Sequence, residues 1–348
     1  MRDRPARQRA GPSPGDRRVR RTRTHRSSRS RSRPRVAAVA RRSQCRAARS
    51  LARRRASAAD GARAVNLLEI RPSYEAALRG PRINPEIATR WLVAFLRDEL
   101  IERRGIRRAV VGLSGGVDSA VTASLCARAL GAENVYAFRL PYATSSPASL
   151  ADAQLVVDAL GINCRTIEIT AAVDGYLQFE PDADARRRGN VMARTRMLVL
   201  FDQSAKLDAL PIGTGNKTER LLGYFTWHAD DTPPLNPLGD LFKTQVWELA
   251  RFLGVPTPLI DKAPSADLEA NQTDEGDLGI TYARADAILD QLLLGYADAQ
   301  LIERGFDSSD VALVRRRVDS THWKRHLPTT AMLTNTAINE FYLRPVDF

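Results

Sequence analysis

The hydrophobic positions of this chain change their spacing repeatedly from residue 84 onward, and each change marks an element. Asn84 followed by Pro85 is typical of a helix N-terminus, with a side-chain cap and a proline at the first helical position. The apolar side chains that follow lie along one face of a helix, at Ile87, Trp91, Phe95 and Leu96. We therefore expect the folded part of the chain to begin with a helix near residue 85.

Short apolar runs then alternate with longer segments of helical spacing. The runs, which we predict to be strands, are 109–111, 134–140, 163–169 and about 209–213. Helices are predicted to start after the glycines at 115–116, to start at Ser146-Pro147, and to span 187–206. Strands that alternate with helices form a parallel, doubly wound sheet flanked by helices, so we expect an α/β, Rossmann-like fold. Residues 241–348 are predicted to be mostly helical.

The basic charge of the chain is confined to its first 64 residues. The whole chain has a net charge of +13, but residues 1–64 hold 22 arginines, no lysine and three acidic residues, whereas residues 65–348 hold 31 basic and 37 acidic residues. Because residues 1–64 have few large apolar side chains, they cannot bury enough surface to fold. We predict a disordered segment over 1–64, a linker over 65–83 and one folded domain over 84–348.

The arginine-rich segment 1–64 has three interpretations. Arginine clusters neutralise phosphates, as in a nucleic-acid-binding arm. A segment rich in Arg and Ser and poor in acids also suits a transit peptide. The third interpretation is translated upstream sequence of a GC-rich gene, with the true start near Val65, and we favour it because arginine without lysine indicates codon bias. The acidic balance of the remaining residues argues against nucleic acid as a partner of the folded domain.

The three cysteines, Cys45, Cys126 and Cys164, stand alone, without a CxxC pair or a zinc-binding spacing. Cys126 falls in a predicted helix and Cys164 in a predicted strand, so both are expected to be buried thiols. This cysteine usage is typical of a reducing, cytoplasmic setting. No stretch of the sequence approaches 18 consecutive apolar residues, and we expect no membrane span.

The segment that follows the first predicted strand carries the most specific chemistry. Residues 112–116 form a glycine-rich turn, and Asp118 and Ser119 open a helix. A strand, a glycine turn and a helix N-terminus bind phosphate, because backbone N–H groups and the helix dipole both favour an anion there. Asp118 adds a carboxylate of the kind that Mg²⁺ prefers. The turn lacks the lysine of GxxxxGK[ST] loops, and the simplest alternative is a turn that only joins strand to helix.

A second strand end, glycine turn and helix lie at residues 213–226. Asn216 suits the N-cap of that helix, and Glu219 falls in its first turn. Ligands of doubly wound sheets bind at the carboxyl ends of the strands, where Glu219 could face Asp118 across a shared Mg²⁺. Alternatively, Glu219 only complements the helix dipole.

The residues Ser114 to Ser119 resemble the pyrophosphate loop of the ATP pyrophosphatases, which split ATP into AMP and pyrophosphate. Within that superfamily, further segments resemble the NAD⁺ synthetase family. These segments are Arg188–Met197, Gly213–Thr226, Asn236–Val246, Pro264–Glu269, Gln272–Glu275 and Lys324–Pro328. The resemblance covers about residues 84–345, and the segments at 213–226 and 236–246 separate this family from others that share the loop.

The resemblance implies a ligase with a two-step reaction. The nicotinate carboxylate of deamido-NAD⁺ attacks the α-phosphate of ATP and releases pyrophosphate, and ammonia then displaces AMP to form the amide of NAD⁺. The residues that it implies for ATP are Gly112, Leu113, Ser114, Gly115, Gly116, Val117, Asp118, Ser119, Thr214, Lys243 and Ser265. Asp118 and Lys243 would be catalytic, and Asp118 and Glu219 would hold Mg²⁺. Arg194 and Lys324 would contact deamido-NAD⁺.

Two segments depart from the family pattern. The family has a lysine where this chain has Trp227 and an acid where it has Pro234, and the family's His-Lys-Arg becomes Trp323-Lys324-Arg325. Such a tryptophan could stack on a nicotinate or adenine ring, or belong to the core. Because both departures fall where the resemblance places the dinucleotide, the alternative function is a related ligase or amidotransferase that acts on a different carboxylate.

The nitrogen source is also implied by the resemblance. Some family members carry a glutaminase domain ahead of the synthetase, and the residues that precede the first predicted helix here lack the cysteine-centred framework of such a domain. We therefore expect the use of free ammonia, or of ammonia from a separate glutaminase subunit. The resemblance also implies a homodimer.

Overall fold

The structure, a computed structural model, describes residues 80–265, 273–326, 330–331 and 333. The chain divides into two units after Arg71, and all described residues belong to the second unit, Pro72–Phe348. The expectations for segment 1–64, for Cys45 and for most of the linker 65–83 lie outside the described residues.

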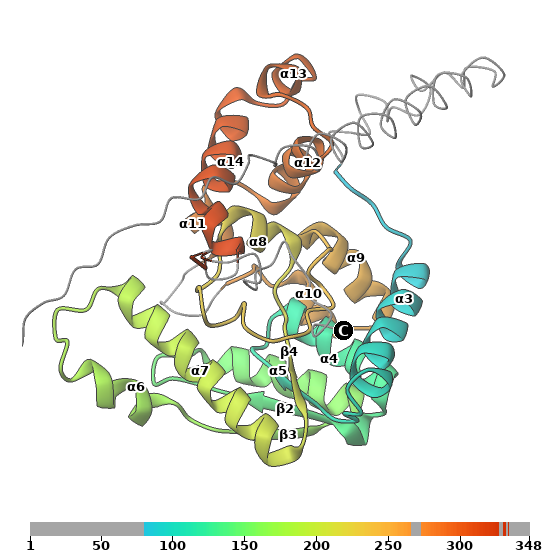
Figure 1. Cartoon of the computed structure of the whole chain (residues 1–348), viewed down its shortest axis with the longest axis vertical. Coiled ribbons are helices and arrows are strands. Elements are labelled where there is room, and N and C mark those ends of the chain that lie inside the picture. The colour runs from blue at the N-terminus through green and yellow to red at the C-terminus, as the bar shows by residue number, and fades with distance from the viewer. Residues whose placement is uncertain (1–79, 266–272, 327–329, 332, 334–348) are drawn as a thin grey trace, which may run out of the picture. The chain divides into compact units, whose positions relative to one another are not determined.

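Four parallel strands form the sheet, in the order β3-β2-β1-β4 (Figure 1). The strand β1 (Ala109–Gly112) pairs with β2 (Val135–Arg139) on one side and with β4 (Leu210–Ile212) on the other, and β3 (Asn163–Thr166) pairs with β2. Since all pairs are parallel, the carboxyl ends of the strands lie at one edge of the sheet. The predicted α/β fold with a parallel sheet is confirmed.

Helices cover both faces of the sheet, as its buried side chains show. Ala109 and Val111 point to one face, where they pack with α3 (Pro85–Arg97), α4 (Val117–Leu130), α5 (Pro147–Leu160) and α9 (Lys243–Leu253). Val110 and Phe138 point to the other face, where they pack with α6 (Thr170–Leu177) and α7 (Ala185–Leu207). The alternation of neighbouring β1 side chains between two cores is the period of a strand buried on both faces. The sheet is therefore doubly wound.

The predicted strand at 163–169 is too long. The strand β3 ends at Thr166, and α6, which the hydrophobic pattern did not reveal, begins at Thr170. The backbone N–H groups of Ile167 and Ile169 still donate to Arg139 and Pro141, at 2.9 Å each. Backbone pairing to β2 thus continues past the end of the strand, which is why the apolar run extends further than the strand itself.

The first helix begins as predicted, with the Asn84 side chain accepting a hydrogen bond from the Ile87 N–H at 3.0 Å and Pro85 in the first turn. Its apolar stripe is only partly buried. Leu96 is fully buried, but Trp91 is 72% exposed. The helix leads into a short π-helical turn, η2 (Asp98–Glu102).

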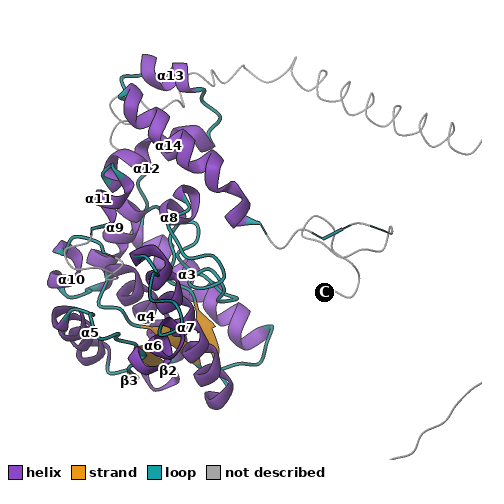
Figure 2. Cartoon of the chain, turned by 90° about the vertical axis from the view of Figure 1, so that its left-hand side faces the viewer, coloured by secondary structure: helices purple, strands orange, loops and turns teal. Residues whose placement is uncertain are grey.

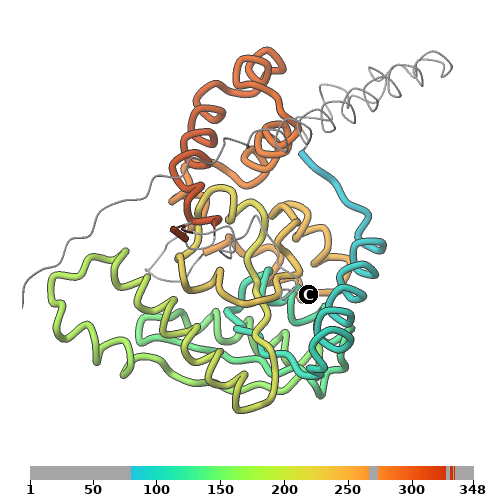
Figure 3. The backbone as a smooth tube through the Cα atoms, viewed as in Figure 1, coloured from blue at the N-terminus to red at the C-terminus, as the bar shows by residue number. Residues whose placement is uncertain are grey.

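The described part of the C-terminal third is mostly helical, as predicted (Figures 2 and 3). Before it, α8 (Lys217–Leu222) follows β4, and within it, α10 (Thr257–Asp261) follows α9. The remaining helices are α11 (Asp274–Leu278), α12 (Tyr282–Leu293), α13 (Asp298–Glu303), α14 (Ser308–Thr321) and the 3₁₀ turn η4 (His322–Arg325). A separate apolar core joins α8, α12 and α14 through Leu222, Ile288 and Val314.

The free thiols differ in burial. Cys126 on α4 is buried as predicted, and burial raises its thiol pKa to about 12. Cys164 on β3 is only half-buried, because β3 is the edge strand of the sheet, so the expectation of a buried thiol was wrong there. Among the described residues, no helix is both long enough and apolar enough to cross a bilayer.

Candidate active site

The two predicted phosphate-binding turns meet where the strand order reverses. The chain passes from β1 to β2 and β3 on one side and then returns to place β4 on the other side of β1. In doubly wound sheets, the loops that leave two such neighbouring strands diverge and open a crevice at their carboxyl ends. The turns 112–116 and 213–216 follow β1 and β4 and lead into α4 and α8, so both turns lie at this edge of the sheet.

The first turn has a shape that requires a glycine at Gly115 and is held by hydrogen bonds. Gly115 has φ +80°, and a Cβ built there would lie 2.2 Å from the carbonyl oxygen of Ser149 on α5. The Ser119 hydroxyl donates to the Gly116 carbonyl at 2.9 Å, and the Gly116 N–H donates to the Ser114 hydroxyl at 3.2 Å. Among the described residues, no side chain caps the N-terminus of α4. The first turn of α4 therefore keeps its N–H groups for an anion.

The second turn is linked to the first by Asn216. The Asn216 side chain accepts a hydrogen bond from the Glu219 N–H at 3.0 Å, and the Glu219 carboxylate accepts one from the Asn216 N–H at 3.2 Å. Asn216 is thus the predicted N-cap, in a reciprocal capping box. Its amide nitrogen also donates to Asp118 Oδ1 at 2.9 Å. The position of Asn216 between a glycine turn and a helix predicted the cap, but nothing in the sequence revealed the contact with Asp118.

Lys243 joins the two acids that the sequence singled out. Its Nζ lies 2.5 Å from Asp118 Oδ2 and 3.3 Å from Glu219 Oε1, and its side chain is 3% exposed. Burial lowers the pKa of the lysine, but the carboxylates of Asp118 and Glu219 outweigh it, and the pKa is raised. Burial raises the pKa of the Glu219 carboxyl to about 8, although Lys243 acts in the opposite direction. The structure therefore brings Asp118, Glu219 and Lys243 into one buried cluster.

A third carboxylate adds negative charge beside this cluster. Asp274 is 5% exposed and accepts a hydrogen bond from the Tyr282 hydroxyl at 2.9 Å; the Tyr224 hydroxyl lies between Asp274, at 3.2 Å, and the nearer Asp277, at 2.8 Å. Burial raises the pKa of the Asp274 carboxyl, and the positive charge of Lys243 acts in the opposite direction. The Lys243 ammonium also lies 5.1 Å from the centre of the Tyr282 ring. The sequence analysis assigned no role to Asp274, because a residue 31 positions after Lys243 has no spacing that would indicate a contact between the two.

Asp286 on α12 fixes the position of the helix that carries Lys243. This fully buried carboxylate accepts hydrogen bonds from the Thr218 hydroxyl at 2.5 Å and from the Thr244 N–H and hydroxyl at 2.9 and 2.8 Å. The Thr218 hydroxyl in turn accepts a hydrogen bond from the Lys243 N–H at 2.9 Å. One carboxylate thus ties the first turns of α8 and α9 together. Glu219 and Lys243 lie on those two turns.

We expect Asp286→Asn to lower kcat about 10²-fold, because small displacements of reacting groups have effects of that size. Asparagine would place an amide N–H₂, a donor, where the carboxylate oxygen accepts from the N–H and O–H of Thr244. These hydrogen bonds would be lost, and the unfolding free energy is expected to fall by about 1–3 kcal/mol. The matched control is Asp290→Asn, one turn further along α12, where the carboxylate contacts only the neighbouring Gln291 amide in the described structure. Steady-state kinetics and thermal unfolding would be compared. Equal turnover in the two folded variants would contradict the positioning role.

The other predicted site residues fall into two groups. Thr214 is half-buried and directly follows β4, while Ser265 is exposed and is the last residue described before the gap at 266–272. Arg194 and Lys324 both hold the segment that follows α8. The Arg194 guanidinium donates to the Trp227 carbonyl at 3.0 Å, and the Lys324 ammonium donates to the carbonyls of Gly223 and Phe225 at 2.9 Å each.

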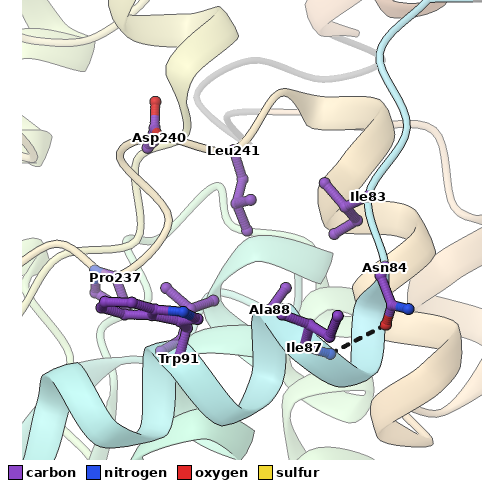
Figure 4. Close-up of a pocket in the computed structure, with 9 residues that line it drawn as sticks. Ile83, Asn84, Ile87, Ala88, Trp91, Pro237, Asp240 and Leu241 are labelled. Carbon is purple, nitrogen blue, oxygen red and sulfur yellow. Dashed lines mark hydrogen bonds between the residues drawn. The ribbon is translucent and has the colours of Figure 1, made fainter.

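One cavity opens beside the first helix, α3. It has a volume of about 320 Å³ and lies between α3 and the segment 237–241, beside Trp91 (Figure 4). Its lining is mainly apolar, and it includes none of the predicted site residues. A smaller cavity of about 180 Å³ is lined by Arg194 together with Asn190 and Arg187 of the same helix. Of the two cavities, only the smaller one touches a predicted site residue.

The parallel sheet, covered by helices on both faces, defines an α/β protein of the Rossmann-like class. A family model described as NAD synthase matches residues 88–328. The chain belongs to this family.

Individual relatives agree with this assignment. The NH(3)-dependent NAD(+) synthetase of Trichlorobacter lovleyi is 49% identical over 258 residues, which cover 74% of this chain and 94% of that protein. The solved structure of the NH3-dependent NAD synthetase of Campylobacter jejuni is 30% identical, with a TM-score of 0.62, over 72% of this chain and 100% of that chain. The NMN synthetase of Francisella tularensis is 33% identical, with a TM-score of 0.63, over 72% of this chain and 99% of that chain.

Proposed function

We propose that this protein is an ammonia-dependent NAD⁺ synthetase, a ligase that forms a C–N bond. The observation that carries the proposal is the buried cluster of Asp118, Glu219 and Lys243 beside the uncapped start of α4. It occurs in a chain whose relative at 49% identity is named NH(3)-dependent NAD(+) synthetase. The acceptor would be deamido-NAD⁺, and the products would be NAD⁺, AMP and pyrophosphate.

In the first step, a carboxylate oxygen of the nicotinate group attacks the α-phosphorus of ATP. The new O–P bond forms the acyl adenylate, and the bond to the β-phosphate breaks, so pyrophosphate leaves with the electron pair. Negative charge on the phosphate oxygens must be stabilised throughout. The N–H groups of the turn Gly112–Ser119 would supply fixed dipoles, and the Lys243 ammonium would supply positive charge. Thr214 and Ser265 would contribute further contacts to ATP.

In the second step, the nitrogen of ammonia attacks the carbonyl carbon of the acyl adenylate. AMP leaves with the electron pair of the C–O bond, and the nitrogen loses a proton to give the neutral amide. Arg194 and Lys324 would hold the deamido-NAD⁺ during both steps. Their side chains already fix the segment 223–227, so they would reach the acceptor from a rigid position.

The acids of the site fit a magnesium ion. Asp118 and Glu219 have side chains that are 16% and 18% exposed, and their oxygens are hard ligands of the kind Mg²⁺ prefers. With Asp274 nearby, three acidic side chains face one basic side chain, Lys243. This excess of negative charge favours the binding of a further cation. The described residues contain no cluster of three or more His, Cys, Asp and Glu side chains arranged for a metal ion. We propose that Asp118 and Glu219 hold Mg²⁺, which when bound would neutralise charge on the phosphates.

We assign the activity to residues 84–348, with free ammonia as nitrogen donor or with ammonia from a separate glutaminase subunit. The homodimer implied by the family resemblance is part of the proposal. The cytoplasm is the proposed location, because Cys126 and Cys164 are free thiols, as is usual in a reducing compartment. Residues 1–64 are proposed to be dispensable for catalysis, so a chain that starts at Val65 should retain the activity of the full chain.

The test is to incubate the full chain with ATP, Mg²⁺, ammonium and deamido-NAD⁺ and to measure AMP and NAD⁺. We expect equal amounts of both, and little NAD⁺ when glutamine replaces ammonium. An Asp118→Asn variant purified in the same way controls for contaminating enzymes. Release of AMP only with another acid, such as nicotinate mononucleotide, would overturn the proposed acceptor. Equal rates with glutamine would overturn the proposed nitrogen source.

A further inference from the structure

The two segments in which the chain departs from the family pattern are in contact. The ring of Trp227, in the loop after α8, lies 5.2 Å from the ring of Trp323 in η4, in an edge-to-face arrangement. The ring of His228 lies 3.8 Å from that of Trp227. Trp227, His228 and Trp323 therefore form one group of rings, here called the aromatic cluster, which joins segments almost 100 residues apart in the sequence.

Charged side chains fix the backbone beneath the aromatic cluster. The Arg194 guanidinium on α7 donates to the carbonyl of Trp227 at 3.0 Å. On the other side, the ammonium of Lys324, the residue after Trp323, donates to the carbonyls of Gly223 and Phe225. The backbone that carries Trp227 is thus fixed, and the indole N–H of Trp323 donates to the Ser320 carbonyl at 3.1 Å. Preorganised groups bind a ligand at a lower entropic cost.

Burial alone does not account for the aromatic cluster. Trp323 is 49% exposed, and His228 is exposed and has φ +58°, a backbone conformation that non-glycine residues rarely adopt. Strained backbone of this kind persists where the surroundings impose it and is concentrated at ligand-binding sites. A core would have taken both indole rings out of water, whereas here an indole surface remains accessible.

The loop that carries the aromatic cluster adjoins a cavity in which Arg187 is paired with Glu180 and Arg194 is the other basic side chain. Arg194, which holds the Trp227 carbonyl, also lines the cavity of about 180 Å³ with Asn190 and Arg187. The Asn190 side chain accepts a hydrogen bond from the Thr226 hydroxyl at 3.1 Å, so the cavity and the loop that carries the aromatic cluster are joined. That loop follows directly from α8, whose first turn holds Glu219. The cluster is one short helix away from the proposed metal site.

We propose that the aromatic cluster is the face against which the nicotinate ring of the acceptor stacks, and that Trp227 and Trp323 determine acceptor specificity. This inference rests on the proposed function. The nicotinate group of deamido-NAD⁺ is a flat N-substituted pyridinium ring with a carboxylate at one edge, and the face of an indole attracts the positive charge of such a ring. An adenine ring can also stack on indole but carries no positive charge, so the pyridinium is the better match.

The first experiment measures steady-state kinetics of the full chain with Trp227→Leu and Trp323→Leu. Each is expected to raise the KM for deamido-NAD⁺ on the order of ten-fold, the size of one cation–π contact, and to leave the KM for ATP unchanged. Trp227→Phe should restore part of the loss. Trp91→Leu, which removes an exposed tryptophan from α3, is the control and should behave as the wild type. Unchanged acceptor KM in both leucine variants, or an equal rise for ATP, would overturn the inference.

A second experiment is independent of turnover and of whether the leucine variants fold. The tryptophan fluorescence of the wild-type protein is titrated with nicotinate mononucleotide, which has the pyridinium without adenine, and with AMP, which has adenine without pyridinium. Saturable quenching by nicotinate mononucleotide that is absent with AMP supports the inference, and stronger quenching by AMP overturns it. If the wild type made no NAD⁺ in the presence of all substrates, the proposed function would fail, and this titration would still decide whether the cluster binds the ring.

Discussion

A Lys243→Met variant is expected to lose about 10²–10³-fold in kcat, the loss typical of removing one electrostatic contact to a developing charge. Lys243 is almost fully buried between Asp118 and Glu219, and its ammonium is proposed to lie against the phosphates of ATP. Methionine has a similar length but no charge. The variant therefore tests the charge rather than the space that the side chain fills.

The same variant is expected to lose stability. Removing one partner of a buried ion pair usually costs about 3–5 kcal/mol, because the other charge is left unpaired. Glu219 can reduce this loss by binding a proton, since burial raises its pKa to about 8. Turnover and thermal unfolding, with and without Mg²⁺, would measure both effects. Lys206→Met, at an exposed position near the end of α7, is the control. Turnover above a tenth of the wild-type value would remove Lys243 from the catalytic site.

The second large effect is expected from Gly115→Ala. The alanine would have to adopt φ +80°, and its methyl group would lie 2.2 Å from the carbonyl oxygen of Ser149. The turn or α5 must therefore move. The backbone strain alone costs about 1–2 kcal/mol. Because the turn is proposed to wrap the ATP phosphates, its displacement should weaken ATP binding at least about ten-fold, a loss of about 1.4 kcal/mol.

Gly161→Ala separates backbone strain from steric clash. Gly161 ends α5 with φ +64°, but a Cβ there would meet no atom within 4 Å. It should therefore lose stability through strain alone and keep its ATP affinity. Calorimetric titration with ATP and thermal unfolding of both variants would decide the matter. An ATP affinity in Gly115→Ala equal to that in Gly161→Ala would show that the close approach to Ser149 does not shape the phosphate site.

The parts of the fold that depend on local sequence could be predicted. The turn after β1 and the start of α4 follow from a few adjacent residues, and α7 was predicted to within two residues at each end. The end of β3 was wrong because pairing to β2 continues without strand geometry up to Ile169. The exposure of Trp91 was not foreseen, since spacing alone does not show whether a facing partner exists.

The site could be predicted only in part, for a physical reason. Asp118 follows β1 and Glu219 follows β4, and these two strands are neighbours in the sheet. The alternation of strands and helices in the sequence predicts a parallel sheet, in which the residues after the strands gather at one edge. Lys243 could be assigned only by family resemblance, because its approach depends on how α9 packs. Asp286 and Asp274 lie in helices whose apolar pattern does not mark their inward faces. Their roles depend on long-range contacts that no local pattern encodes.

The contacts that close the site have a consequence for how the protein is made. Asp118 meets Asn216 across 98 residues and Lys243 across 125 residues, and α9 is tied in turn to Asp286. During synthesis, a ribosome-bound chain that has released β1 but not yet α8 and α9 holds half of the proposed phosphate site, and Asp118 then lacks both of these partners. The complete site proposed for ATP would therefore form late, as contacts of long sequence separation generally do. Because a ligand stabilises only the state that binds it, ATP would favour finished molecules and leave partly synthesised ones unprotected.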